Sequence, residues 1–117
     1  MFVDGSKEPN RTTAVLIQKL AKPLKEIPYR ISITGHTATS ETSLRPDYGS
    51  WNLSADRANT VRQILEQAGY PSENIYKVVG KADTDPLFPE DRSIAANRRV
   101  TITLIHEAPP VPPDLLP

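Results

Sequence analysis

The sequence predicts one α+β domain, a two-layer sandwich with its elements in the order β-α-β-α-β-β. The main observation is that two amphipathic helical patterns alternate with short segments in which every second residue is apolar. The length of 117 residues agrees, because it can enclose one hydrophobic core but not two. We assign residues 1–106 to the domain and the proline-rich residues 107–117 to an extended C-terminal tail.

The composition excludes several classes of function. Fourteen basic side chains balance fourteen acidic ones, so no overall field attracts nucleic acid or an anionic membrane. The apolar runs are too short to span a bilayer. The chain has no cysteine, which excludes disulfides, thiol catalysis and cysteine metal sites.

The first half of the domain is expected to hold a strand, a helix and a second strand. Met1–Val3 is read as an edge strand or the remnant of one, cut at the N-terminal edge of the domain. Pro9 suits a helix entry, and Pro23 should end or bend that helix. The apolar face of this helix consists of Ala14, Ile17, Leu20, Ala21 and Leu24. Residues 30–34 alternate as a half-buried strand.

The second helix is expected to begin at Ser50, whose hydroxyl can cap free backbone N–H groups, and to end at Gly69. Its apolar face consists of Leu53, Val61, Ile64, Leu65 and Ala68. Residues 75–79 and 99–105 are the two remaining strands. Residues 83–97 form the loop between them, with a short helical turn at 93–96.

Arg57 falls on the apolar face of the second helix, four residues after Leu53 and four before Val61. A guanidinium stays charged and is costly to dehydrate without a partner, so an anion should meet it. Glu41 or Asp47 are candidate partners within the chain, whereas Asp56 should point away because neighbouring helical residues diverge by roughly a hundred degrees. An external anion is the equally weighted alternative.

Catalytic and metal sites are weaker interpretations. His36 follows a strand end, but no spacing in the chain indicates a nucleophile–base–acid arrangement. The acidic loop lacks the glycine and terminal glutamate of a calcium loop; its carboxylates are Asp83, Asp85, Glu90 and Asp91. We therefore predict no catalytic residue, no metal and no cofactor.

Three segments in order resemble the OmpA-like peptidoglycan-binding domains. They are Ile31-Ser-Ile-Thr-Gly-His-Thr37 at a strand end, Leu53-Ser-Ala-Asp-Arg-Ala58 on a helix, and Asn97-Arg-Arg-Val-Thr-Ile102 at the last strand. Within that family, the run from Tyr48 to Asn59, with Trp51, is similar to the stator subunits of flagellar motors. Together the three motifs cover the chain to about His106.

The resemblance implies a mixed sheet and a binding function without catalysis. The expected function is non-covalent attachment of a flagellar stator to peptidoglycan in the periplasm. The expected partners are the peptide stem, a second copy of the chain in a homodimer, and a membrane subunit of the stator. The contact with that subunit would use a membrane segment that this chain lacks, so the chain is expected to be a C-terminal fragment of an inner-membrane protein.

The resemblance also implies the ligand-binding residues. Arg57 matches the family arginine that meets the free carboxylate of diaminopimelate in the peptide stem, and a bidentate arginine–carboxylate pair supplies geometry as well as charge. The remaining positions line or support the pocket: Thr37 and Ser40 at the strand end, Leu53 and Ala58 on the helix, and Asn97 and Arg98 as scaffolding at the last strand.

Ala38 is the departure from the family pattern, which has an aspartate there for the ammonium of diaminopimelate. Losing a charge-assisted hydrogen bond costs about 1.5–3 kcal/mol, roughly ten- to a hundred-fold in affinity. Three outcomes follow. Glu41 or Asp47 substitutes, weak binding is helped by dimer avidity, or another cell-wall group is recognised. The alternative functions are a dimerisation or regulatory domain with weakened wall binding, and a cell-wall anchor of another envelope complex.

Overall fold

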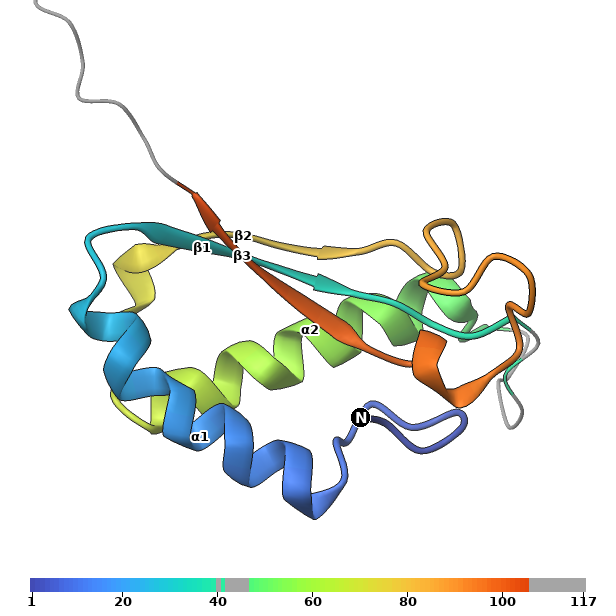
Figure 1. The fold of residues 1–117 in the computed structure, drawn as a ribbon, viewed down its shortest axis with the longest axis horizontal. Helices are drawn as coiled ribbons and strands as arrows, with labels where there is room; N and C mark the ends of the chain where they lie inside the picture. Colours follow the sequence, from blue (N-terminus) through green and yellow to red (C-terminus); the bar gives the residue numbers. More distant parts are fainter. Residues whose placement is uncertain (40, 42–46, 106–117) are drawn as a thin grey trace, which may run out of the picture.

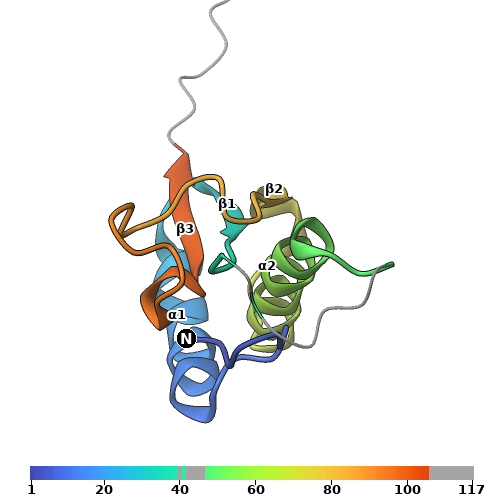
Figure 2. The ribbon, with the colours of Figure 1, turned by 90° about the vertical axis from the view of Figure 1, so that its right-hand side faces the viewer.

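The computed structural model describes residues 1–39, 41 and 47–105, so the expected tail 107–117, Ser40 and His106 lie outside the described residues. The elements are α1 (Arg11–Glu26), β1 (Arg30–Gly35), α2 (Ser50–Gln67), β2 (Ile75–Gly80) and β3 (Val100–Ile105), with short 3-10 turns at Ser72–Asn74 and Ala95–Asn97. Both helices lie on one face of the sheet (Figures 1 and 2), which gives the two predicted layers.

The sheet has the strand order β2-β1-β3, with β1 parallel to β2 and antiparallel to β3. The mixed sheet and the α+β class are therefore confirmed. The predicted first strand is wrong in extent, because Met1–Val3 contributes only an isolated antiparallel bridge between Phe2 and Pro9. The described residues thus hold three strands rather than four.

The helix ends differ in detail from the sequence prediction. Helix α1 continues through Pro23 to Glu26, so the proline lies in the last turn of the helix. Ser50 is the first helical residue rather than the cap. Gly49 precedes it, and the Asn52 side chain accepts the Gly49 N–H at 3.0 Å. The C-terminal prediction is confirmed, since Gly69 follows α2 with a φ of 103°.

Helix α2 packs directly on the sheet, and two glycines let it come close. A Cβ at Gly35 would lie 1.9 Å from the Ser54 carbonyl oxygen, and one at Gly80 would lie 2.5 Å from the Ala55 nitrogen. Both glycines end their strands, so the N-terminal half of α2 lies against the carboxyl ends of β1 and β2. This close approach brings the helix residues after Ser54 to the end of β1.

The core is one cluster between α1, α2 and the sheet, with Phe2 at its edge; its buried members are Phe2, Ile17, Ala21, Ile31, Ile33, Ala58, Val61, Leu65, Tyr70 and Val100. The predicted helical and strand faces of the sequence supply most of these residues. Among the described residues, neither helix combines the length and the apolar character that a membrane span requires.

Candidate functional site

Arg57 is fully buried, with 0% of the residue exposed. It lies on the inner face of α2 between Leu53 and Val61, as the helical spacing predicts. The neighbouring Asp56 points elsewhere and accepts a hydrogen bond from the Tyr48 hydroxyl. The sequence therefore placed the charge correctly on the buried side of the helix.

Arg57 has an anionic partner within the chain. Its Nη1 donates to Glu41 Oε1 at 2.7 Å and its Nη2 donates to Glu41 Oε2 at 2.6 Å, a bidentate pair. The two side chains are 0% and 1% exposed. Of the carboxylates expected within the chain, it is Glu41 that pairs with Arg57, whereas binding of an external anion at Arg57 stays a prediction.

Four donors surround the Glu41 carboxylate. Besides the two Arg57 nitrogens, the Ala38 N–H donates to Oε1 at 2.8 Å and the Gly5 N–H donates to Oε2 at 2.7 Å. We call these four donors the carboxylate cradle. Each oxygen accepts two hydrogen bonds, so the arrangement matches the full acceptor capacity of a planar carboxylate.

The three remaining N–H groups of Arg57 donate to main-chain carbonyl oxygens. Its Nε donates to Ser6 O at 2.8 Å, Nη1 to His36 O at 3.0 Å, and Nη2 to Val3 O at 3.1 Å. Its Cζ lies 5.0 Å from the centre of the Phe2 ring, within cation–π range. All five N–H donors are therefore used, which is how the structure accommodates a fully buried guanidinium.

His36 and Thr37 continue β1 into the site. Thr37 is 2% exposed, and its Oγ1 has no hydrogen-bond partner among the described residues. His36 Nε2 lies 3.3 Å from Thr101 Oγ1, while Nδ1 has no partner in the described part of the chain. Burial, followed by the positive charge of Arg99, lowers the pKa of His36 to about 4. The imidazole is therefore neutral at pH 7.

Asn97 organises the loop between β2 and β3. Its Oδ1 accepts from Leu87 N at 2.8 Å and Phe88 N at 3.1 Å, and its Nδ2 donates to Asp91 O at 3.1 Å. The residue is 0% exposed. These contacts are those of a scaffold residue, and none of them reaches the carboxylate cradle.

Arg98 connects the start of the chain to the segment before β3 through a hydrogen bond, in which its Nε donates to Phe2 O at 2.9 Å. Leu53 and Ala58 are both buried on α2, at 1% and 0% exposure. Ala38 contributes its backbone N–H. Of the other expected residues, Thr37 lies beside the cradle in sequence and Ser40 is outside the described residues.

The N-terminal segment of the site is not predicted from the sequence. Residues 3–6 supply two carbonyls and one N–H to Arg57 and Glu41. Backbone groups are present in every residue, so no sequence pattern marks the ones that bind a buried charge. The pair Gly5-Ser6 is the one local signal, because Gly5 has a φ of 73° that favours glycine.

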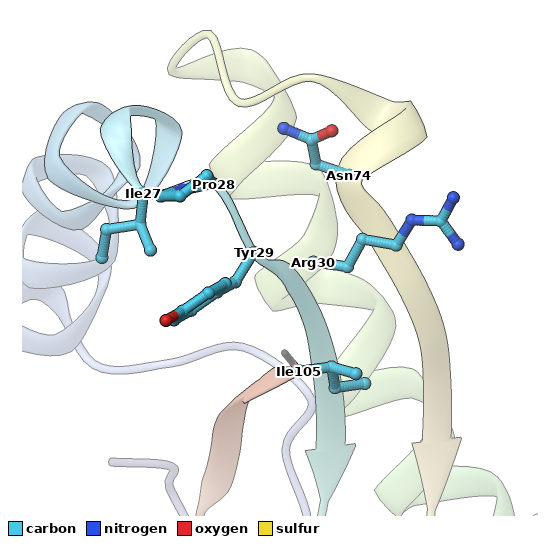
Figure 3. Close-up of a pocket in the computed structure, with 6 residues that line it drawn as sticks. All are labelled: Ile27, Pro28, Tyr29, Arg30, Asn74 and Ile105. Atoms are coloured by element: carbon cyan, nitrogen blue, oxygen red, sulfur yellow. The ribbon is translucent and has the colours of Figure 1, made fainter. Parts of the chain in front are cut away.

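A pocket at the other end of β1 (Figure 3) shares no lining residue with the cradle. Its lining consists of Ile27, Pro28, Tyr29, Arg30, Asn74 and Ile105. Tyr29 and Arg30 point to opposite sides of the strand (Figure 3). The lining has no carboxylate or histidine side chain. In the described part of the chain, no three His, Asp or Glu side chains gather as metal ligands.

Comparison with known proteins gives one consistent result. Residues 1–99 match the model of the OmpA family. Motility protein B of Escherichia coli K12 is 35% identical over 108 residues, covering 92% of this chain and 35% of that protein. The flagellar export/assembly protein LafU of Escherichia coli O44:H18, named as putative, is 34% identical over 105 residues, covering 90% of this chain and 34% of that protein. This chain thus spans about a third of the length of these relatives.

Solved structures share the fold. The C-terminal domain of Helicobacter pylori MotB superposes with a TM-score of 0.77 at 23% identity, covering 92% of this chain and 84% of that one. The cell wall anchor of the T6SS from Pseudomonas aeruginosa superposes with a TM-score of 0.72 at 26% identity, covering 92% and 76%. The MotB domain and the T6SS cell wall anchor therefore both have this fold.

Proposed function

This chain belongs to the OmpA family, and from this premise we propose that it is the periplasmic anchoring domain of a MotB-like flagellar stator subunit. Its role is to hold the stator to peptidoglycan by non-covalent binding rather than by catalysis. The full-length protein would reach MotA through a membrane segment and would place this domain in the periplasm as a homodimer.

The observation that carries the proposal is the carboxylate cradle. Two guanidinium N–H groups and two backbone N–H groups converge on one planar carboxylate, and charge-assisted bonds of this kind are about twice as strong as neutral ones. A peptide stem of peptidoglycan offers a free carboxylate on its diaminopimelate. The same four donors are suited to that group, with Arg57 as the residue that selects it.

Ala38 leaves the ammonium end of diaminopimelate without its family partner. Glu41 cannot serve as that partner while it lies in the cradle, because both of its oxygens already accept two hydrogen bonds there. We therefore propose recognition through the carboxylate end, with an affinity below that of family members with the aspartate. A dimer would compensate, since two linked sites on one sacculus raise avidity by roughly 10²–10⁴.

A second candidate function is a dimerisation or regulatory domain that has lost wall binding. The occupied cradle favours it, because Glu41 takes every position that a ligand carboxylate would need. An anchor of another envelope complex is the third candidate, and the shared fold of the P. aeruginosa wall anchor supports it.

Co-sedimentation with purified sacculi tests the proposal. We expect the unaltered domain to sediment and Arg57→Lys to lose at least tenfold in affinity, because an ammonium keeps the charge but lacks the planar fork. Arg62→Lys on the exposed side of the same helix is the matched control and should sediment normally. Equal sedimentation of the domain and Arg57→Lys would exclude the cradle as the wall site, and no sedimentation with intact self-association would favour the regulatory domain.

A further inference from the structure

The carboxylate cradle is already occupied by the protein itself. Arg57 uses all five of its donors, and the Glu41 carboxylate uses all four of its acceptor positions. We propose that Glu41 is a resident internal ligand, and that an external carboxylate binds only after the Glu41 side chain has left the cradle. This inference rests on the proposed function and adds to it how the site is opened.

Simultaneous occupancy is excluded on two grounds. The Arg57 and Glu41 side chains are 0% and 1% exposed, so the pair leaves no open face for a second anion. A second carboxylate beside Glu41 would also place two like charges on one guanidinium, which disfavours the ionised form of both. The wall ligand and Glu41 are therefore alternatives at one site.

The exchange is chemically balanced. Arg57, Ala38 and Gly5 would donate the same four hydrogen bonds to the incoming carboxylate that they now donate to Glu41. The bonds made and broken are alike, so their strengths largely cancel. The state with Glu41 in the cradle is favoured because the polypeptide chain keeps Glu41 close to Arg57. Such a tethered competitor acts at an effective concentration of about millimolar. The apparent affinity falls in proportion to the fraction of open sites.

Glu41 also stands three residues after Ala38, in the loop that follows β1. The cradle uses the backbone N–H of residue 38, so a side-chain carboxylate at that position is not required to build it. The presence of Glu41 in the cradle is thus independent of the residue type at position 38. Glu41 controls whether a ligand can enter the site, whereas Arg57 determines which chemical group binds there.

Glu41→Gln is the first test, with a soluble diaminopimelate-containing stem peptide as the probe. The neutral amide presents an NH₂ group to the Arg57 donors and cannot hold the cradle as a carboxylate does. We expect the stem peptide to bind Glu41→Gln at least tenfold more tightly than the unaltered domain. Glu66→Gln is the matched control, since it makes the same chemical change beside Arg62 and should leave the affinity unchanged.

The second test uses the unaltered domain and does not depend on how the variant folds. Titration with the stem peptide is followed by NMR at the Glu41 side-chain carboxyl carbon and at the Ala38 and Gly5 amides. We expect the carboxyl resonance of Glu41 to move as its carboxylate leaves Arg57, in step with the two amides.

The outcomes separate the two proposals. Binding to the unaltered domain with no change at the Glu41 carboxyl would overturn the inference and leave wall anchoring in place, as would equal affinities of the unaltered domain and a folded Glu41→Gln. Absence of binding to the stem peptide and to sacculi in both proteins would overturn the proposed function and the inference together.

Discussion

Helix α2 carries two arginines five residues apart, and each has a carboxylate at 2.6 Å. Arg57, on the buried side, is 0% exposed and its five donors all meet acceptors in the protein. Arg62, on the solvent side, is 28% exposed and donates to Asn59 and Glu66. Distance does not distinguish the two ion pairs, whereas burial does.

The difference teaches which interactions shape the site. A solvent-exposed pair keeps its water and typically contributes about 0–1 kcal/mol. A buried pair loses that water, so it is tolerated only when its remaining donors and acceptors are satisfied. The completeness of the Arg57 network is therefore a requirement of burial, and the chain supplies three carbonyls from distant segments to meet it.

The largest expected effect comes from removing the buried arginine. Arg57→Met leaves the Glu41 carboxylate buried with two of its four donors gone, and we expect the free energy of unfolding to fall by about 3–5 kcal/mol. Urea unfolding at pH 7 measures it. The double variant Arg57→Met/Glu41→Leu removes both charges and should recover a large part of the loss. A single-variant cost below about 1 kcal/mol would mean that the pair behaves like a surface pair.

The next effect is a dependence of the free energy of unfolding on pH, which comes from the buried residue His36. Its folded pKa of about 4 lies below the ordinary value of 6.5, so the unfolded chain binds a proton in that interval and the folded one does not. The neutral form of His36 therefore stabilises the folded state above pH 6.5. This contribution to the free energy of unfolding, up to about 3 kcal/mol, is lost as the pH falls toward 4. We expect His36→Gln to lack this part of the slope in urea unfolding. Identical slopes in both proteins would show that His36 charges freely in the folded state.

A smaller effect should follow from moving α2 away from the sheet. Gly35→Ala places a methyl group 1.9 Å from the Ser54 carbonyl oxygen, and we expect a loss of about 1–3 kcal/mol together with weaker sacculus binding. Gly49→Ala is the control, because nothing lies within 4 Å of its added methyl group and its φ is −97°. The control should cost no more than about 1 kcal/mol, the loss of a favourable cap residue. Similar losses in both variants would argue against the close approach of α2.

The smallest effect is expected on the exposed side of the helix. Glu66→Gln removes the partner of Arg62 at the i, i+4 spacing, and we expect a loss of about 0.3–0.5 kcal/mol that shrinks at high salt. Thermal unfolding at low and high ionic strength measures it. A loss of several kcal/mol that is insensitive to salt would contradict the contrast between the two arginines.

The sequence predicts the parts of this molecule that depend on local periodicity. The apolar faces of both helices and the alternation in residues 30–34 and 99–105 define their elements to within a few residues, and Arg57 is placed on its buried stripe. The prediction of a first strand at Met1–Val3 is wrong in extent, because a segment this short cannot show the alternation of apolar and polar residues that marks a strand. Three residues carry no periodic signal.

The partner of Arg57 depends on contacts that no local pattern encodes. Glu41 was one of the carboxylates within reach in sequence, but the choice among them is made by where α2 meets the end of β1. That position depends on Gly35 and Gly80, which have no side chain to keep α2 away from the sheet. In the sequence these glycines indicate only the ends of strands and do not indicate that a helix packs against them. The carbonyls of Val3 and Ser6 are equally unmarked.

The hydrogen bonds between the start of the chain and two arginines have a mechanical consequence. Phe2 is attached to Arg98, and Val3 and Ser6 are attached to Arg57, so tension applied at Met1 reaches the Arg57 guanidinium within a few residues. Gly5 lies in the same short stretch and supplies one of the four cradle donors. Pulling this stretch away would open the cradle from one side while the sheet and α2 are still intact. Because Phe2 is itself buried in the core cluster, tension from this end acts on one edge of the core and on the cradle together.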